Sequence, residues 1–264
     1  AMRIHHLNCG TLCPLAVPNM VCHCLLVECP DRLVLVEAGL GTRDVADPNA
    51  RLGRLLKTLI RPTLRGEETA VAQVRRLEFS PEDVRDIVLT HLDVDHVGGI
   101  DDFPQASVHV LRDEYEAAFE PTTAFEAKRY ARSRWARTAH FVQHEPAGEP
   151  WFGFECVREI PGMQGELLMV PLPGHTRGHA AIAIRVGDRC LLHCGDAYLF
   201  HGEMANPYRC PVALRLFQRD CFDNAMRKHN QARLRALCAD TESGVDVFCA
   251  HDVREFERFG RVDA

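Results

Sequence analysis

The amino-acid sequence predicts a single domain of the α/β (α+β) class, with β-sheets inside and helices outside. Apolar, strand-like segments come in two groups, and helical segments follow each group, an order that is typical of packed layers. The chain has 264 residues, which is long enough to bury a hydrophobic core without the help of disulfide bonds. No low-complexity linker or short-period repeat interrupts the pattern. We therefore treat residues 1–264 as one domain.

The N-terminal segments predict an antiparallel meander. Three runs alternate or are continuously apolar, with turn residues between them: 3–9, 21–28 and 33–37. Pro30-Asp31-Arg32 supplies a hairpin turn between the last two. Residues 42–66 are polar and weakly periodic, so a surface loop with a short helix is expected there. Residues 67–78 have the apolar spacing of a helix.

Ser80-Pro81-Glu82-Asp83 predicts the start of a short helix. It combines a capping serine, a proline in the first turn and acids near the positive end of the helix dipole. The following segments predict strands at 86–90 and 107–111, and helices at 112–119 and 123–140. Residues 115–154 are charged and aromatic, and we expect a helical insertion near a site or an interface. The C-terminal half predicts strands at 167–171, 180–186, 190–193 and 245–249, and helices at 211–221 and 223–239.

Composition narrows the class of partner. The net charge is −6 and no basic stripe stands out, so nucleic acid is not expected as a partner. No apolar run approaches the roughly 18 residues that span a bilayer, and the start lacks the apolar core of a signal peptide. The twelve cysteines are scattered, several in apolar segments, which favours a reducing, cytoplasmic compartment. We expect a small-molecule substrate and a possible homodimer.

The segment from Thr90 to Gly99 carries the strongest chemical signal. It reads Thr-His-Leu-Asp-Val-Asp-His-Val-Gly-Gly and follows a short apolar run, Ile87-Val88-Leu89. A strand that ends in closely spaced histidines and aspartates delivers them to one place at the edge of a sheet. The sequence therefore predicts a metal site there, with four candidate ligands: His91, Asp93, Asp95 and His96. Cys22-His23-Cys24, by contrast, lacks metal-knuckle spacing and is interpreted as part of a strand.

Three further segments each place a donor just past an apolar strand. They are Pro173-Gly174-His175, Gly195-Asp196 and Ala250-His251. Strand ends gather along the rim of a sheet, so these donors can converge with the first motif. His179, four residues after His175, is expected to be structural rather than a ligand.

The order of these motifs resembles the metallo-β-lactamase superfamily over nearly the whole chain. The family pattern is a His-x-His-x-Asp-His loop, a Gly-His loop, a strand-end aspartate and a strand-end histidine, and Glu37 and Gly39 fall where the family has an Asp-x-Gly turn. The resemblance implies a four-layer αββα sandwich with two divalent metal ions, most simply zinc, on its rim. It further implies that one metal is held by His91, Asp93 and His175, that the other is held by Asp95, His96 and His251, and that Asp196 bridges them.

Asp93 departs from the family pattern, which has a second histidine there. A carboxylate can ligate zinc, but it is a harder donor and shifts the preference toward manganese or iron. A one-metal site, with Asp93 pointing away, is the alternative.

Two such metals would activate a water for attack on a carbonyl or phosphoryl group. Asp95 would orient that water, and Tyr198, two residues past Asp196, is the candidate proton donor, with a packing role as its alternative. The chain looks most similar to N-acyl homoserine lactone hydrolases, so the favoured function is metal-dependent hydrolysis of a lactone or other small ester. The alternatives are an iron-dependent thiol or persulfide oxidoreductase, a thioester hydrolase on the same fold, and a non-catalytic ligand-binding relative.

Overall fold

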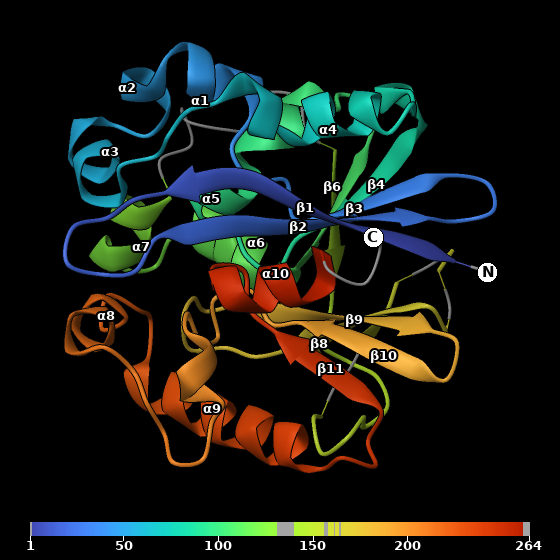
Figure 1. The fold of residues 1–264 in the computed structure, drawn as a ribbon, viewed down its shortest axis with the longest axis vertical. Helices are drawn as coiled ribbons and strands as arrows, with labels where there is room; N and C mark the ends of the chain where they lie inside the picture. The colour runs from blue at the N-terminus through green and yellow to red at the C-terminus, as the bar shows by residue number, and fades with distance from the viewer. Residues whose placement is uncertain (1, 131–139, 156–157, 161, 164, 261–264) are drawn as a thin grey trace.

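The computed structural model describes residues 2–130, 140–155, 158–160, 162–163 and 165–260. Two sheets pack face to face, and helices cover the outer side of each sheet (Figure 1). The chain therefore has the αββα layering that the sequence predicts.

The first sheet follows the order of the chain. Its strands are β1 (Arg3–Leu12), β2 (Met20–Glu28), β3 (Leu33–Val36), β4 (Val84–Val88), β5 (Ser107–Leu111) and β6 (His140–His144). The first three strands are antiparallel, as the predicted meander requires, and the last three continue the sheet in parallel. Helical segments make the crossovers that parallel strands need.

The second sheet has the order β11 (Val245–Phe248), β10 (Arg189–His193), β9 (Ala180–Val186), β8 (Leu167–Pro171) and β7 (Arg158–Glu159). Strand β9 is antiparallel to both β8 and β10, and β11 is parallel to β10. Strands β8, β10 and β11 consequently run in one direction. Their C-terminal ends therefore lie on the same rim of the sheet.

Strands β2 and β3 of the first sheet are largely apolar on both faces because both faces are covered. In β2, Leu25 and Val27 pack between the sheets, whereas Cys24 and Leu26 pack toward the outer helices. Successive side chains of a strand alternate in direction, so a continuous apolar run fills both layers. Full burial of one such aliphatic side chain stabilises the fold by roughly 1.5–3 kcal/mol.

The helices on the outside are mostly short. Those of the first half are α1 (Thr42–Ala46), α2 (Pro48–Arg51), α3 (Arg54–Ile60), α4 (Ala70–Arg76), α5 (Val94–Val97), α6 (Arg112–Phe119) and α7 (Ala124–Arg129). Those of the second half are α8 (Val212–Phe217), α9 (Asn224–Ala239) and α10 (Val253–Gly260). Turns of 3₁₀ helix lie at Gly66–Glu68, Pro81–Asp83, Gly98–Asp102 and His201–Glu203. Figure 1 shows α4 on the outer side of the first sheet and α9 on that of the second.

Several sequence expectations need correction. Residues 42–60 form three short helices, and a 3₁₀ turn begins at Gly66, where a loop with one helix was expected over 42–66. The helix expected over 123–140 ends at Arg129 within the described residues, and His140 begins strand β6, which pairs in parallel with β5. Residues 131–139 of that expectation lie outside the described residues. The sequence analysis also missed β6, β7 and α10.

In the described part of the chain no helix is long and apolar enough to cross a membrane. The eleven described cysteines are all free thiols.

Candidate metal centre

The candidate ligands lie on loops that follow four strands. His91 and Asp93 precede α5, and Asp95 and His96 lie within it, shortly after β4. His175 follows β8, Asp196 follows β10 and His251 follows β11. Because these last three strands run in the same direction, their ends deliver all three side chains to one rim. The structure brings all seven candidate ligands together at that rim.

One group contains His91, Asp93, His175 and Asp196, whose ligand atoms all lie within 4.8 Å of one another. The Oδ2 atom of Asp93 is 3.2 Å from Nε2 of His91 and 3.0 Å from Nε2 of His175. Asp93 therefore points into the centre, and the alternative in which it points away is not what the structure shows.

A second group contains His96, Asp196 and His251. Oδ1 of Asp196 is 3.4 Å from Nε2 of His96 and 3.1 Å from Nε2 of His251. Oδ2 of Asp196 lies 3.4 Å from Nε2 of His175 in the first group. The Asp196 carboxylate thus presents one oxygen to each group, as a bridging ligand would.

Asp95 lies beside the second group. Its Oδ2 atom is 3.6 Å from Nε2 of His251, and these two residues cluster with the thiol of Cys22. Cys22 lies on β2, and the sequence analysis assigned it only to a strand. A thiol is a plausible neighbour for a metal, but no spacing pattern links position 22 to the motif at 91–96.

The polar atoms of this centre fit a cation. Nε2 of His91 and Oδ1 of Asp196 are buried and have no hydrogen-bond partner in the described part of the chain. Leaving a buried polar atom unpaired costs about 1–3 kcal/mol, so native sites rarely do so without a ligand. Imidazole and carboxylate donors are those that zinc, manganese and iron accept.

Three of the four candidate ligand histidines, His91, His96 and His251, are oriented through their other ring nitrogen. Nδ1 of His91 contacts Thr90 Oγ1 at 2.8 Å, and Nδ1 of His251 donates to the Val21 carbonyl at 2.7 Å. Nδ1 of His96 lies 2.5 Å from Glu37 Oε2, while Glu37 Oε1 accepts the Thr90 amide. Such contacts leave Nε2 free for a metal and fix the direction of the ring.

Protons compete with a metal for the same atoms. Burial alone would raise the pKa of Asp196, but His251 and His96 hold it well below its usual value. For His96 the effect of burial has the opposite sign, and burial alone would lower its pKa. The negative charges of Glu37 and Asp196 outweigh burial and raise the pKa of His96 well above its usual value. A divalent cation would displace these protons, so metal binding at this centre should release protons.

His179 is structural, as expected. Its Nδ1 atom bonds the Leu172 carbonyl at 3.2 Å, and its Nε2 atom accepts the backbone N–H of Asp196 at 3.0 Å. Burial and the neighbouring His91 keep the pKa of His179 well below its usual value, so the ring is neutral. It therefore fixes the backbone of Asp196 instead of binding a metal.

Glu114 on α6 is a functional support that the sequence analysis missed. Its carboxylate accepts the backbone N–H of Leu92 at 2.9 Å and the Thr176 hydroxyl at 2.6 Å. It also accepts the Tyr130 hydroxyl at 2.7 Å and the Gly178 amide at 3.2 Å. A single buried carboxylate therefore joins the motif loop, the Gly-His loop and α7.

Arg129 on α7 is the second residue that was missed. Its Nε donates to Asp93 Oδ1 at 2.7 Å, and its Nη2 contacts Asp93 Oδ2 and lies 2.7 Å from Nε2 of His175. Burial alone would raise the pKa of Asp93, but Arg129 and then His91 hold it well below its usual value. Burial, followed by Arg129, lowers the pKa of His175 to about 4. Part of the predicted 115–154 insertion thus lies at the centre.

The structure contradicts the proton-donor role predicted for Tyr198 and favours its packing alternative. Its side chain has no exposed surface, and its hydroxyl donates to Glu255 of α10, 3.0 Å from both carboxylate oxygens. It packs among residues between the second sheet and α9, including Leu192 and Leu234. A phenol enclosed in this way has a packing role and cannot reach a substrate in this conformation.

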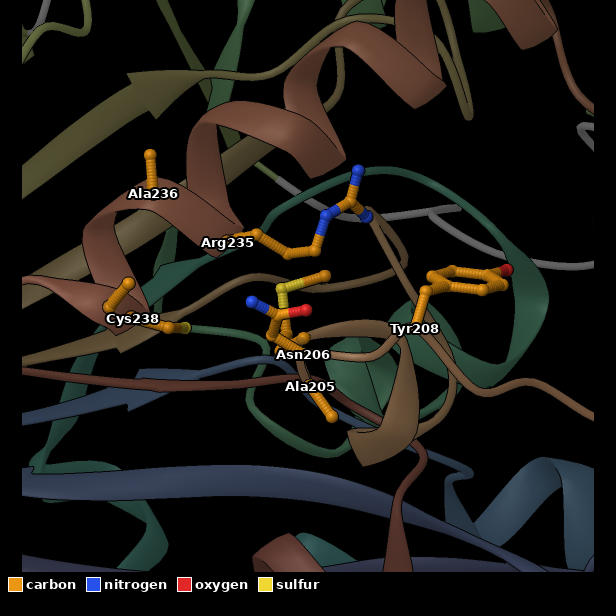
Figure 2. Close-up of a pocket in the computed structure, with 8 residues that line it drawn as sticks. Ala205, Asn206, Tyr208, Arg235, Ala236 and Cys238 are labelled. Carbon is orange, nitrogen blue, oxygen red and sulfur yellow. The ribbon is translucent and has the colours of Figure 1, made fainter.

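A small pocket of about 130 Å³ adjoins the centre at His251. Its apolar lining comprises Met20, Leu199, Phe200, Leu214 and Val253, and its polar lining includes His201, Asp252 and Arg254. A larger cavity of about 490 Å³ lies between α9 and the segment after Glu203 (Figure 2). Its lining includes Tyr208, Arg235 and Cys238 but none of the seven candidate ligands, so it is separate from the centre.

Comparison with known proteins agrees with this geometry. Residues 17–237 match the model of the metallo-β-lactamase superfamily. The chain is 41% identical over 252 residues to the probable metallo-hydrolase Rv2300c of Mycobacterium tuberculosis, covering 95% of this chain and 80% of that protein. It is 32% identical to the N-acyl homoserine lactonase AttM of Rhizobium johnstonii, covering 67% and 66% of the two chains.

Solved structures share the fold. A Bacillus thuringiensis AiiA variant with N-decanoyl-L-homoserine bound at its active site superposes with a TM-score of 0.72 at 20% identity, covering 97% of this chain and 95% of that one. The dizinc lactonase AidC, in complex with its product, gives a TM-score of 0.56 at 16% identity, with 89% and 74% covered. At these identities the likeness shows the fold alone.

Proposed function

Because this chain belongs to the metallo-β-lactamase superfamily and is a metallo-hydrolase, we propose that it opens a lactone or other small ester with the help of two divalent metal ions. The observation that carries this proposal is Asp196, whose two oxygens face two separate groups of donors. His91, Asp93 and His175 would hold one ion, and Asp95, His96 and His251 would hold the other. Zinc is the expected metal, with manganese or iron favoured by the carboxylate of Asp93.

Two bound ions supply a nucleophilic water at neutral pH and polarise the substrate carbonyl. The protein's own part is to hold the donors rigidly, which the contacts of Glu37, His179 and Glu114 achieve. Asp95 has a partly exposed side chain at the edge of the centre, so it can accept a proton from that water.

The pocket beside His251 supports a small, partly apolar substrate. Met20, Leu199, Phe200 and Leu214 offer it an apolar wall, and a volume of about 130 Å³ suits a ring or a short acyl chain. Relatives named N-acyl homoserine lactonase point to the same class of substrate.

His201 gives this pocket a polar side chain of fixed orientation. It lines the same pocket as His251, and its side chain is 29% exposed. Nδ1 of His201 lies 2.8 Å from Asp252 Oδ2, and Arg254 contacts Nε2 at 3.1 Å. Because an arginine only donates, Nε2 of His201 accepts the Arg254 N–H and Nδ1 carries the ring proton toward Asp252, so the ring is held in one tautomer and can orient a substrate but not donate a proton to it.

The test is hydrolysis of a panel of lactones, alkyl esters and thioesters by protein reconstituted with zinc, manganese or iron. We expect lactones or small esters to be hydrolysed, and activity to disappear with a chelator and return when metal is added. Consumption of a thiol or persulfide by an iron-loaded form, without lactone hydrolysis, would replace this proposal with the oxidative alternative. Binding of metal without any turnover would favour the non-catalytic one.

A further inference from the structure

Asp93 and Arg129 form a pair that explains how an aspartate can stand in this metal centre. We propose that Arg129 is a positioning residue, which holds the Asp93 carboxylate toward the first metal position and offsets its charge. The aspartate–arginine pair then takes the place of one neutral histidine. This inference rests on the proposed metal centre and adds to it a residue from outside the ligand motifs.

The contact fixes both the position and the direction of the carboxylate. The guanidinium of Arg129 meets both oxygens of Asp93, which is the fork geometry that an arginine offers and a lysine does not. Held in this way, Asp93 turns Oδ2 toward His91 and His175, at 3.2 Å and 3.0 Å. Both side chains of the pair are largely buried, with exposed fractions of 13% and 15%, so water screens their charges only weakly.

The charges of the centre support the same conclusion. It contains three carboxylates, Asp93, Asp95 and Asp196, and a histidine at position 93 would leave two. Arg129 contributes one positive charge directly at the additional carboxylate. A carboxylate and a guanidinium together sum to zero, as a neutral imidazole does, so the centre keeps the charge that two divalent ions would meet in a histidine-bearing site.

Arg129 is not free to bind a substrate, because each of its nitrogens is engaged. Nε and Nη2 contact Asp93, Nη2 also donates to Nε2 of His175 at 2.7 Å, a contact that a bound metal would replace, and Nη1 donates to the backbone carbonyl of Asp220 at 3.2 Å. The helix that carries it is anchored as well, since Glu126 of α7 pairs with Arg177 of the Gly-His loop at 2.9 Å. A guanidinium fixed at three points is suited to support a ligand rather than to follow a substrate.

The pair is tested by replacing Asp93 alone and then Asp93 together with Arg129. Zinc per chain and the zinc affinity of the weaker site would be measured by competition with a chromophoric chelator. The set comprises the parent, Asp93→His, Asp93→His with Arg129→Gln, and Asp93→His with Arg189→Gln. Arg189 is an exposed arginine that pairs with Asp246 away from the centre, so it controls for removal of any positive charge.

We expect Asp93→His alone to weaken the affected site about tenfold or more, because Arg129 then faces the metal without its counter-charge. Adding Arg129→Gln should bring the affinity back to within about threefold of the parent, and adding Arg189→Gln should not. If Asp93→His does not fold by circular dichroism, Asp93→Asn, which keeps the shape of the side chain, replaces it in the same comparison.

Equal affinity of Asp93→His and the parent would overturn the role of Arg129 while leaving the metal centre intact. Failure of Arg129→Gln to restore a weakened site, or restoration by Arg189→Gln, would overturn it too. A parent protein that binds no zinc would instead remove the metal centre itself.

Discussion

The carboxylate of Glu37 lies 2.5 Å from Nδ1 of His96, and both side chains are buried. Glu37 has a φ of +63°, a left-handed conformation that is uncommon for a residue with a side chain and is found at functional sites. The contact directs Nε2 of His96 toward Asp196 and holds the ring in one tautomer. Glu37, which stands where the family pattern has the Asp of an Asp-x-Gly turn, thus orients a candidate metal ligand.

Replacement of Glu37 by Gln should therefore weaken metal binding about tenfold, because loss of a partner of this kind typically costs 10–100-fold in affinity. Competition with a chelator measures the change. Glu28→Gln is the matched control, since Glu28 makes a similar contact with His5 at 2.6 Å outside the centre. An equal loss of affinity in both variants would show that the effect is not specific to His96.

Tyr198→Phe should leave turnover within about twofold of the parent and lower the free energy of unfolding by about 1 kcal/mol, the usual worth of one hydrogen bond. The expected loss is that of the bond to Glu255, which lies in the core. Denaturant unfolding and steady-state kinetics measure the two quantities. A tenfold fall in kcat with normal stability would return Tyr198 to the active site.

Glu255 should make the stability of the protein depend on pH. Burial raises its pKa from 4.5 to about 7 in the folded protein. A carboxyl with a raised pKa favours the fold while it is protonated, so its contribution is complete below about pH 4.5 and is lost as the pH rises through 7. Relative to Glu255→Gln, the parent should lose about 3 kcal/mol across this interval. A difference in the free energy of unfolding between the parent and Glu255→Gln that stays constant over this pH interval would contradict the raised pKa of Glu255.

The layers and the clustering of the candidate ligands could be predicted from the sequence because both depend on local pattern. Each ligand follows an apolar strand, and the direction of the strands places their ends on one rim. Arg129 and Glu114 could not be found in this way, since they reach the centre across 36 and 22 residues of chain. In the sequence, both lie in charged helical segments that resemble solvated surface.

Tyr198 was misplaced for a related reason. Its nearness to Asp196 in the chain suggested nearness to the metals. Its direction is set by Glu255 of α10, a helix that the sequence analysis did not predict. The strand at His140–His144 was missed because the polar and histidine residues at its ends continued the charged character of the preceding segment.

The most direct test of the two-metal centre is the metal content of the parent protein and of Asp196→Ala, determined by elemental analysis after gentle purification. We predict about two divalent ions per chain in the parent and at most one in the variant, because a bridging carboxylate serves both positions. Two ions retained in Asp196→Ala, or no ion in the parent, would contradict the account.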